Sequence, residues 1–132
     1  MERDLSLVLL DTSALIYLTA SPDRLSSKAV DAIESSDLLF VSSISFWEIG
    51  IKEQSGRLVL PMDLDTFVER TTLATDVQIL PVDLQVWMGN VYLDWDNRDP
   101  ADRTIVATAQ LISLPIVTSD RRMHTFDHET IW

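Results

Sequence analysis

The stretch Leu7-Val8-Leu9-Leu10-Asp11-Thr12-Ser13-Ala14-Leu15 joins a short apolar run to the start of a helical segment through a single aspartate. The apolar run, residues 5–10 with Ser6 interrupting it, predicts a strand buried on both faces, as in a parallel sheet. Asp11 follows the run directly, at a position that suits the N-cap of the next helix. Ligands in open parallel sheets bind beyond the carboxyl ends of the strands, so the same position also suits a functional carboxylate. Both interpretations of Asp11 stay open.

Further apolar runs alternate with helical patterns along the chain. Strands are expected at residues 38–41, 77–80 and 114–117, each buried on both faces, with a short fifth strand near Ile131. Helices are expected at residues 26–35 with Ser26 as cap, at 43–54 ended by Gly56, after Asp63, after Asp83, and from Pro100 to before Pro115. No Asn-Gly or Asp-Gly hairpin signal joins two strands. The pattern predicts an α/β fold, a three-layer α/β/α sandwich with a mainly parallel sheet of four or five strands, as one domain over residues 1–132.

Composition restricts the class of protein. The 132 residues include 21 acidic and 10 basic side chains, for a net charge of −11, and no cysteine. The lack of cysteine excludes a disulfide framework, a thiolate zinc site and a cysteine nucleophile. The acidic balance argues against nucleic-acid binding through a broad basic surface, although it is compatible with a nuclease that meets phosphates with metal ions and a few arginines. It also suits a basic protein partner. The first apolar run is too short for a signal peptide or a membrane span, so a cytoplasmic location is expected.

Acidic residues stand at strand ends or helix starts at four separate places: Asp11, Glu48, Asp102 and Asp120. Asp120 closes the run 116–119 and therefore repeats the position of Asp11 after a strand. The alternative for Asp120 is an ordinary surface turn. Like charges a few ångströms apart repel one another, so a cluster of these groups that stayed ionised would need a cation.

Proline spacing separates the roles of two neighbouring aspartates. Pro100 fits the first helical position, which makes Asp99 the N-cap. Asp102 then lies in the first turn, on the face shared with the apolar Ile105 and Ala109. We therefore assign Asp102 to chemistry and Asp99 to structure.

Three roles are possible for Glu48: a functional carboxylate, a member of a capping box, or a partner in a surface ion pair. Ser42 and Ser43 both offer a helix cap, and with Ser43 as cap Glu48 lies in the second turn of a helix that is apolar on nearly every side and should be largely buried. A buried carboxylate is costly unless it is paired or metal-bound, which favours a functional role. Ser45 offers instead a capping box, and Lys52 offers an i,i+4 ion pair on the helix surface.

Other candidate side chains give weaker signals. His124 and His128 stand four residues apart in the tail and are expected to be solvated rather than metal-binding. Trp47, Trp87 and Trp95 lie on apolar faces or in a loop, where packing is expected rather than stacking on bases.

The four acidic segments together resemble PIN-domain proteins, and within them the VapC-type ribonuclease toxins of bacterial toxin–antitoxin pairs. The matching stretches are Leu-Asp-Thr-Ser-Ala-Leu at 10–15, Ser-Ser-Ile-Ser-Phe-Trp-Glu-Ile at 42–49, Arg-Asp-Pro-Ala-Asp-Arg-Thr-Ile-Val-Ala-Thr-Ala at 98–109, and Val-Thr-Ser-Asp at 117–120. The resemblance runs from residue 9 to residue 120. It implies a Rossmann-like sandwich in which Asp11, Glu48, Asp102 and Asp120 form the metal-binding and catalytic set, with Thr12 and Ser119 as supporting hydroxyls.

A site made only of carboxylate oxygens suits Mg²⁺ or Mn²⁺ rather than zinc. The expected function is that of a metal-dependent endoribonuclease that hydrolyses RNA phosphodiester bonds, the toxin of a type II toxin–antitoxin pair. The resemblance implies a basic, VapB-like antitoxin as partner and a homodimer or a toxin–antitoxin hetero-oligomer. The candidates for contacts with RNA phosphates are Arg57, Arg98, Arg103, Arg121 and Arg122.

Functions from other classes either stay open or lack a residue that they need. A non-catalytic PIN-like module that binds RNA or protein stays open, as does nuclease activity directed at DNA. A phosphotransfer enzyme with an aspartate after its first strand commonly needs Asp-x-Asp, but residue 13 is serine. A receiver domain of the response-regulator type needs a lysine after a late strand, and Lys28 and Lys52 are the only lysines. Ser13 has no nearby His–Asp arrangement, so a serine hydrolase lacks its base.

Overall fold

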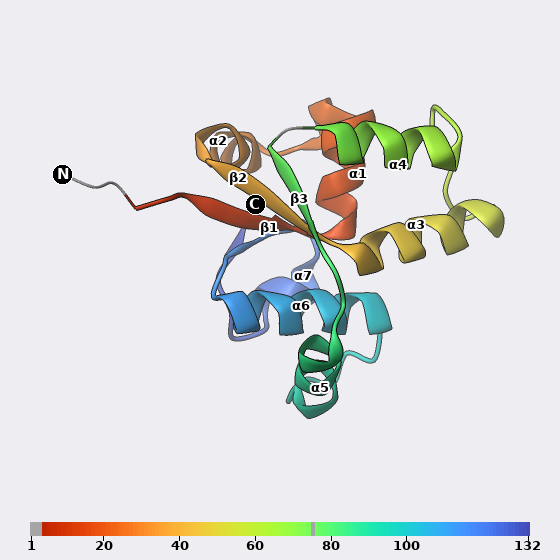
Figure 1. The fold of residues 1–132 in the computed structure, drawn as a ribbon. Coiled ribbons are helices and arrows are strands. Elements are labelled where there is room, and N and C mark those ends of the chain that lie inside the picture. Colours follow the sequence, from red (N-terminus) through yellow and green to blue (C-terminus); the bar gives the residue numbers. More distant parts are fainter. Residues whose placement is uncertain (1–3, 75) are drawn as a thin grey trace.

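The strands of the computed structural model, which describes residues 4–74 and 76–132, form a five-stranded sheet in the order β3-β2-β1-β4-β5 (Figure 1). Their bounds are β1 Leu7–Leu10, β2 Leu38–Ser42, β3 Val77–Leu80, β4 Ile116–Val117 and β5 Thr130–Ile131. Every neighbouring pair is parallel, and central β1 sets Leu9 opposite Phe40 of β2 and Ile116 of β4. The predicted parallel sheet and the short fifth strand are confirmed.

Side-chain caps determine where most helices begin. The helices are α1 Thr12–Ala20, α2 Ser27–Ser35, α3 Ser43–Gln54, α4 Leu64–Leu73, α5 Leu84–Tyr92, α6 Pro100–Ile112 and α7 Arg121–His124, with a 3-10 turn at Pro22–Arg24. The predicted caps of α2, α4, α5 and α6 are all confirmed. Helix α3 is capped by Ser42, one of the two serines that the sequence offered as caps, and the Ser42 hydroxyl accepts from the Ile44 N–H at 3.2 Å. Gly56 follows α3 with a φ of 78°, a left-handed conformation that costs glycine little.

Helices cover both faces of the sheet and enclose a core on each. On one face, Leu15 of α1, Ile49 of α3 and Phe67 of α4 pack with the strands in one cluster. On the other face, Ile105 of α6 and Met123 of α7 belong to a second cluster. In Figure 1, α1, α2 and α4 lie above the sheet and α5, α6 and α7 lie below it. The three-layer α/β/α sandwich is therefore confirmed.

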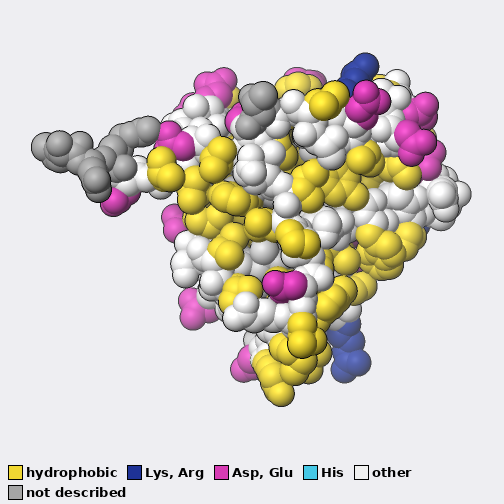
Figure 2. All heavy atoms as spheres, viewed as in Figure 1, with side chains coloured by type: hydrophobic (Ala, Val, Ile, Leu, Met, Phe, Trp, Pro, Cys, Tyr) yellow, Lys and Arg dark blue, Asp and Glu magenta, His cyan; other side chains and the backbone are white. Residues whose placement is uncertain are grey.

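Two predictions of burial are wrong in part. Strand β3 has only one neighbour because it forms an edge of the sheet, and Ile79 is 36% exposed. Helix α3 extends beyond the sheet, so Trp47 and Ile51 on it are 51% and 40% exposed (Figure 1). Trp87 of α5 is also half-exposed, and hydrophobic side chains spread across this face of the molecule (Figure 2). Packing inside the domain is thus confirmed only for Trp95, whose ring lies 5.2 Å from that of Phe126.

No helix in the described part of the chain is long and apolar enough to cross a membrane.

Truncating the central strand should destabilise the whole domain. Leu10 is fully buried in β1 between β2 and β4, so we expect Leu10→Ala to lower the free energy of unfolding by about 3 kcal/mol, measured by urea denaturation followed by circular dichroism. Leu5→Ala is the matched control, because Leu5 is 65% exposed before the strand begins and should change stability by less than about 0.5 kcal/mol. Equal losses in the two variants would contradict this account of the core.

Candidate active site

Three of the predicted acidic residues meet at one edge of the sheet. Asp11 follows β1 and Asp120 lies three residues beyond β4, and these two strands pair with each other. Asp102 comes from the first turn of α6. Asp11 is the N-cap of α1 and Asp120 the N-cap of α7. All three carboxylates therefore lie at helix N-termini, where the partial positive charge of the helix dipole favours an anion.

Asp11 is the most deeply buried of the three, at 4% exposure. Its Oδ1 accepts from the Ala14 N–H at 2.8 Å, and its Oδ2 accepts from the Thr118 hydroxyl at 2.5 Å. Burial raises the pKa of Asp11 to about 7, the negative charges of Asp102 and Asp120 push it in the same direction, and the two hydrogen bonds oppose the rise. Asp11 thus caps α1 and also brings a carboxyl to the site, so the two interpretations of this residue are compatible.

Asp102 faces the same edge and is 9% exposed. Its Oδ2 accepts from the Asn97 side-chain amide at 3.0 Å and from the Arg122 guanidinium at 3.1 Å. Burial raises the pKa of Asp102 to about 6, while the Asn97 hydrogen bond and the Arg122 charge act to lower it. The Oδ1 of Asp99 accepts from the Asp102 N–H at 2.9 Å, which confirms Asp99 as the helix cap.

Arg122 places a positive charge between two of the carboxylates. Its guanidinium lies 3.1 Å from Asp102 and 3.4 Å from Asp120, and its side chain is 62% exposed. The backbone N–H of Arg122 also donates to Asp120 Oδ1 at 2.9 Å. The acidic cluster, as folded, is therefore partly neutralised by a cation of the same chain.

Glu48 stands beside this cluster rather than within it. Its side chain is 12% exposed and forms an i,i+4 ion pair with Lys52 at 3.3 Å, one of the two alternatives raised for it. The capping box does not form, because Ser45 lies inside α3, which begins at Ser43 and is capped by Ser42. The buried Ser45 hydroxyl oxygen instead accepts from the Thr12 hydroxyl at 2.9 Å. Glu48 lines a pocket with Asp99 and other residues at the start of α6. It is not among the charges that shift the pKa of Asp11 or Asp102.

Within residues 4–74 and 76–132, no three Asp, Glu or His side chains are arranged closely enough to hold a metal ion. The chemistry of the donors nevertheless fits a divalent cation. All of them are carboxylate oxygens, which Mg²⁺ and Mn²⁺ prefer. Burial disfavours the negative charge of Asp11 and Asp102, and a nearby cation would offset that cost.

The supporting hydroxyl at the site differs from the expected ones. Thr12 donates to Ser45, and no hydrogen bond joins Ser119 to an acidic side chain in the described part of the chain. Thr118 takes the role instead, because its hydroxyl donates to Asp11 and accepts from the Asp120 N–H at 3.0 Å. A threonine whose hydroxyl binds the backbone N–H two residues ahead is a known turn pattern, and that pattern was the available sequence signal. Which neighbouring hydroxyl faces the site depends on strand geometry.

Asn97 is a second side chain at the site that the sequence interpretation missed. It donates to Asp102, and its side-chain oxygen accepts from the Asp99 N–H at 2.9 Å. An Asn that binds the N–H two residues ahead is a turn pattern that can be recognised from sequence. Its contact with Asp102 depends on the path of the loop before α6.

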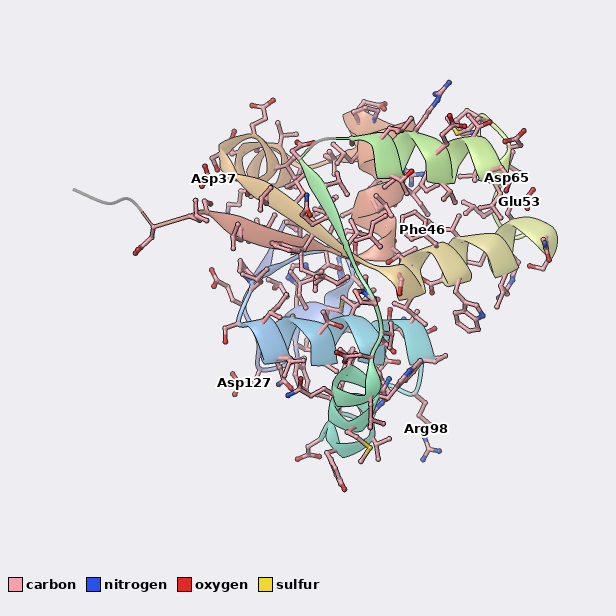
Figure 3. The ribbon with its side chains drawn as sticks, viewed as in Figure 1. Asp37, Phe46, Glu53, Asp65, Arg98 and Asp127 are labelled. Carbon is pink, nitrogen blue, oxygen red and sulfur yellow. The ribbon has the colours of Figure 1, made fainter. Side chains whose placement is uncertain are left out.

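The five candidate arginines occupy different environments. Arg122 lies at the site, and Arg121 beside it is exposed. Arg98 points away from the body of the domain (Figure 3). Arg57 lines the pocket beside Glu48, and its Nε donates to the Ser55 hydroxyl at 2.9 Å. The guanidinium of Arg103 is fully engaged inside the chain, so its contacts do not support the expected role in holding a phosphate.

The two histidines contact the chain on either side of β4, with His124 exposed to solvent as expected and His128 half-buried. His124 Nε2 lies 2.8 Å from the Thr118 carbonyl oxygen, and its other ring nitrogen lies 2.7 Å from the Thr130 hydroxyl. His128 Nε2 lies 2.6 Å from the Leu114 carbonyl oxygen. Both rings thus bind backbone carbonyls that flank β4.

Comparison with known proteins shows which family this chain belongs to. The family model described as PIN domain matches residues 8–129. The chain belongs to the PIN-domain family. It is 34% identical over 129 residues to Ribonuclease VapC22 of Mycobacterium tuberculosis, across 95% of this chain and 98% of that protein.

Solved structures share the fold of this PIN domain at low identity. A toxin–antitoxin complex from Klebsiella pneumoniae superposes with a TM-score of 0.65 at 19% identity, across 95% of this chain and 96% of that chain. VapBC-1 from nontypeable Haemophilus influenzae superposes with a TM-score of 0.63 at 18% identity, across 94% and 96%. At these identities, the two structures support the fold alone.

The buried carboxyl of Asp11 should make metal-free stability depend on pH. The folded pKa of Asp11, about 7, lies above its ordinary value of 3.8, so the contribution of this carboxyl to stability is most favourable below about pH 4 and is lost as the pH rises through 7. We expect Asp11→Asn, which stays neutral, to be more stable than the wild type at pH 8 in EDTA by on the order of 1–3 kcal/mol. The difference should shrink towards pH 5, as measured by urea denaturation. The control is Asp31→Asn, an exposed carboxyl on α2, and a gain in D11N that is equal at both pH values would contradict the prediction.

Proposed function

We propose that this PIN domain is a divalent-metal-dependent endoribonuclease of the VapC type, the toxin of a type II toxin–antitoxin pair. The observation that carries the proposal is the pair of buried carboxyls, Asp11 and Asp102, at one sheet edge with their pKa values raised to about 7 and about 6. Perturbed carboxyls of this kind cluster at functional sites. The 34% identity to a ribonuclease across nearly the whole chain supports the choice of RNA as substrate.

The residues that would hold Mg²⁺ or Mn²⁺ are Asp11, Asp102 and Asp120, with Glu48 approaching from α3. When bound, a divalent ion would supply Lewis-acid stabilisation of the charge that develops on a phosphodiester under attack. Thr118 holds Asp11 Oδ2 in place, and Asn97 holds Asp102 Oδ2. Because these partners fix the oxygens before substrate arrives, the site loses little energy to reorganisation during the reaction.

Arg122 suits a second role in the same site. Its guanidinium forms an exposed ion pair with Asp102 and Asp120, and such pairs are weak and easily exchanged. Release of Arg122 would free carboxylate oxygens for a metal ion. The freed guanidinium would then stand next to the substrate, where its fork of donors matches a phosphate. Arg121 and Arg57, which lie at or near the rim, are further candidates for phosphate contacts.

Cleavage of RNA should depend on metal and on the buried carboxyls. We expect wild-type protein to cleave total RNA in Mn²⁺ or Mg²⁺, and EDTA to abolish that cleavage. Asp11→Asn and Asp102→Asn should each reduce the rate by at least about 100-fold, as expected for loss of a positioned catalytic group. Asp31→Asn, distant from the site on α2, should cleave like the wild type.

Two outcomes would reject parts of this proposal. Cleavage that persists in EDTA or in D11N would reject the metal–carboxylate mechanism. Failure of metal-loaded wild type to cleave any RNA would favour the alternative, a non-catalytic PIN-like module that binds RNA or protein.

We further propose that a basic, VapB-like antitoxin inhibits the enzyme by inserting an Arg or Lys side chain among these carboxylates. A net charge of −11 favours a basic partner. The position of Arg122 supports the idea, because a guanidinium already lies between Asp102 and Asp120 in the free chain. The likeness to a solved toxin–antitoxin complex is consistent with such a partner. An inserted cation and a divalent ion would compete for the same oxygens.

Removing the guanidinium of Arg122 should reveal this competition. We expect Arg122→Gln to bind Mn²⁺ about two- to fivefold more tightly than the wild type, measured by electron paramagnetic resonance titration, since an exposed ion pair contributes only modestly. Arg121→Gln is the control, because it removes the same charge from the neighbouring position without breaking a contact to Asp102. Weaker Mn²⁺ binding in R122Q than in R121Q would show that Arg122 and the metal do not compete.

A further inference from the structure

All the donors of Arg103 are used inside the chain. Its Nε donates to the Asn90 side-chain oxygen at 3.3 Å. One terminal nitrogen donates to the carbonyl oxygens of Trp95 at 2.6 Å and Asn97 at 3.0 Å. The other donates to the carbonyl oxygens of Asn90 at 2.7 Å and Leu93 at 2.9 Å. A guanidinium has five N–H donors, so five different acceptors account for all of them.

These acceptors define one segment of the molecule. Asn90 lies in the last turn of α5, and Leu93, Trp95 and Asn97 belong to the loop between α5 and α6. Carbonyls at a helix C-terminus and in a loop lack the regular partners of helix interiors, and Arg103 supplies partners for four of them. No carboxylate within residues 4–74 and 76–132 forms an ion pair with Arg103. Its charge is therefore directed at the backbone of this loop.

The loop that Arg103 holds presents Asn97 to the site. The backbone carbonyl of Asn97 is held by Arg103, and its side-chain oxygen is held by the Asp99 N–H. With that oxygen engaged, the side-chain amide nitrogen faces Asp102 and donates to Oδ2 at 3.0 Å. No hydrogen bond from the described residues reaches Asp102 Oδ1, which is therefore left available for a ligand.

We infer that Arg103 and Asn97 are positioning residues: Arg103 fixes the loop between α5 and α6, and Asn97 in that loop fixes the Asp102 carboxylate, which would hold a divalent metal. This inference rests on the proposed function. It gives Arg103 a role opposite to a phosphate contact, because the residue acts from behind the site through Asn97. Partners in the shell behind metal ligands commonly change metal affinity or activity by about 10- to 100-fold when they are removed.

The chemistry of the side chain explains why this position needs arginine. Lysine has three donors on a single nitrogen. It cannot reach acceptors that are spread over the end of α5 and the loop after it. Arg103→Lys therefore keeps the charge and most of the apolar stem but releases part of the loop. The comparison of R103K with Asn97→Ala then separates the loop clamp from the hydrogen bond at Asp102.

The test combines metal binding with a measurement on the metal-free protein. We expect Asn97→Ala to weaken Mn²⁺ binding about tenfold in electron paramagnetic resonance titrations, and to lower kcat for RNA with little change in KM. R103K should weaken Mn²⁺ binding by a similar factor and shift the NMR signals of the Asn97 side-chain amide in metal-free protein. The double variant should bind Mn²⁺ no more weakly than the weaker single variant, because the two residues act in series. Asp96→Asn, an exposed neighbour in the same loop, should match the wild type within about twofold.

Several results would overturn the inference. These are unchanged Mn²⁺ affinity in N97A, unchanged Asn97 amide signals in R103K, or losses that multiply in the double variant. If circular dichroism shows that R103K fails to fold, exchange of the Arg103 Nε proton in wild type decides, because fast exchange would contradict a closed clamp. The NMR comparison in metal-free protein tests the contact between Arg103 and Asn97 whether or not the wild type cleaves RNA. Failure of this inference can therefore be distinguished from failure of the proposed function.

Discussion

The parallel pairing of β1 with β4 brings Asp11 against Thr118, 107 residues away in the chain, and the site depends on that contact. The threonine hydroxyl donates to one oxygen of a carboxyl that is almost completely buried. A buried anion is costly, so burial raises the pKa of Asp11 to about 7, while the Thr118 hydroxyl and the N-terminus of α1 stabilise the charged form in part. The sheet thus holds a proton-binding carboxyl at its carboxyl edge.

Asp102 and Asp120 complete the acidic cluster, and burial of their charges costs less free energy than burial of Asp11. Asp102 is less buried and has two side-chain donors, and Asp120 is closer to solvent. Three helix N-termini converge on the cluster, so the backbone contributes positive potential even before a cation arrives. The arrangement costs stability at neutral pH in the metal-free protein. Such a cost is typical of sites whose purpose is binding and catalysis rather than folding.

The few basic side chains of this acidic protein have separate structural roles. Arg122 neutralises the front of the acidic cluster, and Arg103 organises the loop behind it. Lys52 forms an ion pair with Glu48, the fourth predicted acid, which stands apart from the other three. The sequence alone does not distinguish between arginines near an acidic motif, so all of them were expected to contact phosphates. Their contacts show that one of them faces inward, with every donor satisfied.

The sequence by itself determined the parallel α/β sandwich and four helix caps, Asp99 among them. These features follow from local periodicity and from the fixed backbone preferences of Pro and the capping residues. Tertiary structure decided that Thr118 rather than Ser119 supports Asp11, that Asn97 reaches Asp102, and that β3 and part of α3 are exposed. Those outcomes depend on which strands are neighbours, where the sheet ends and how a loop returns to it. Such relations join residues distant in the chain, and no local pattern encodes them.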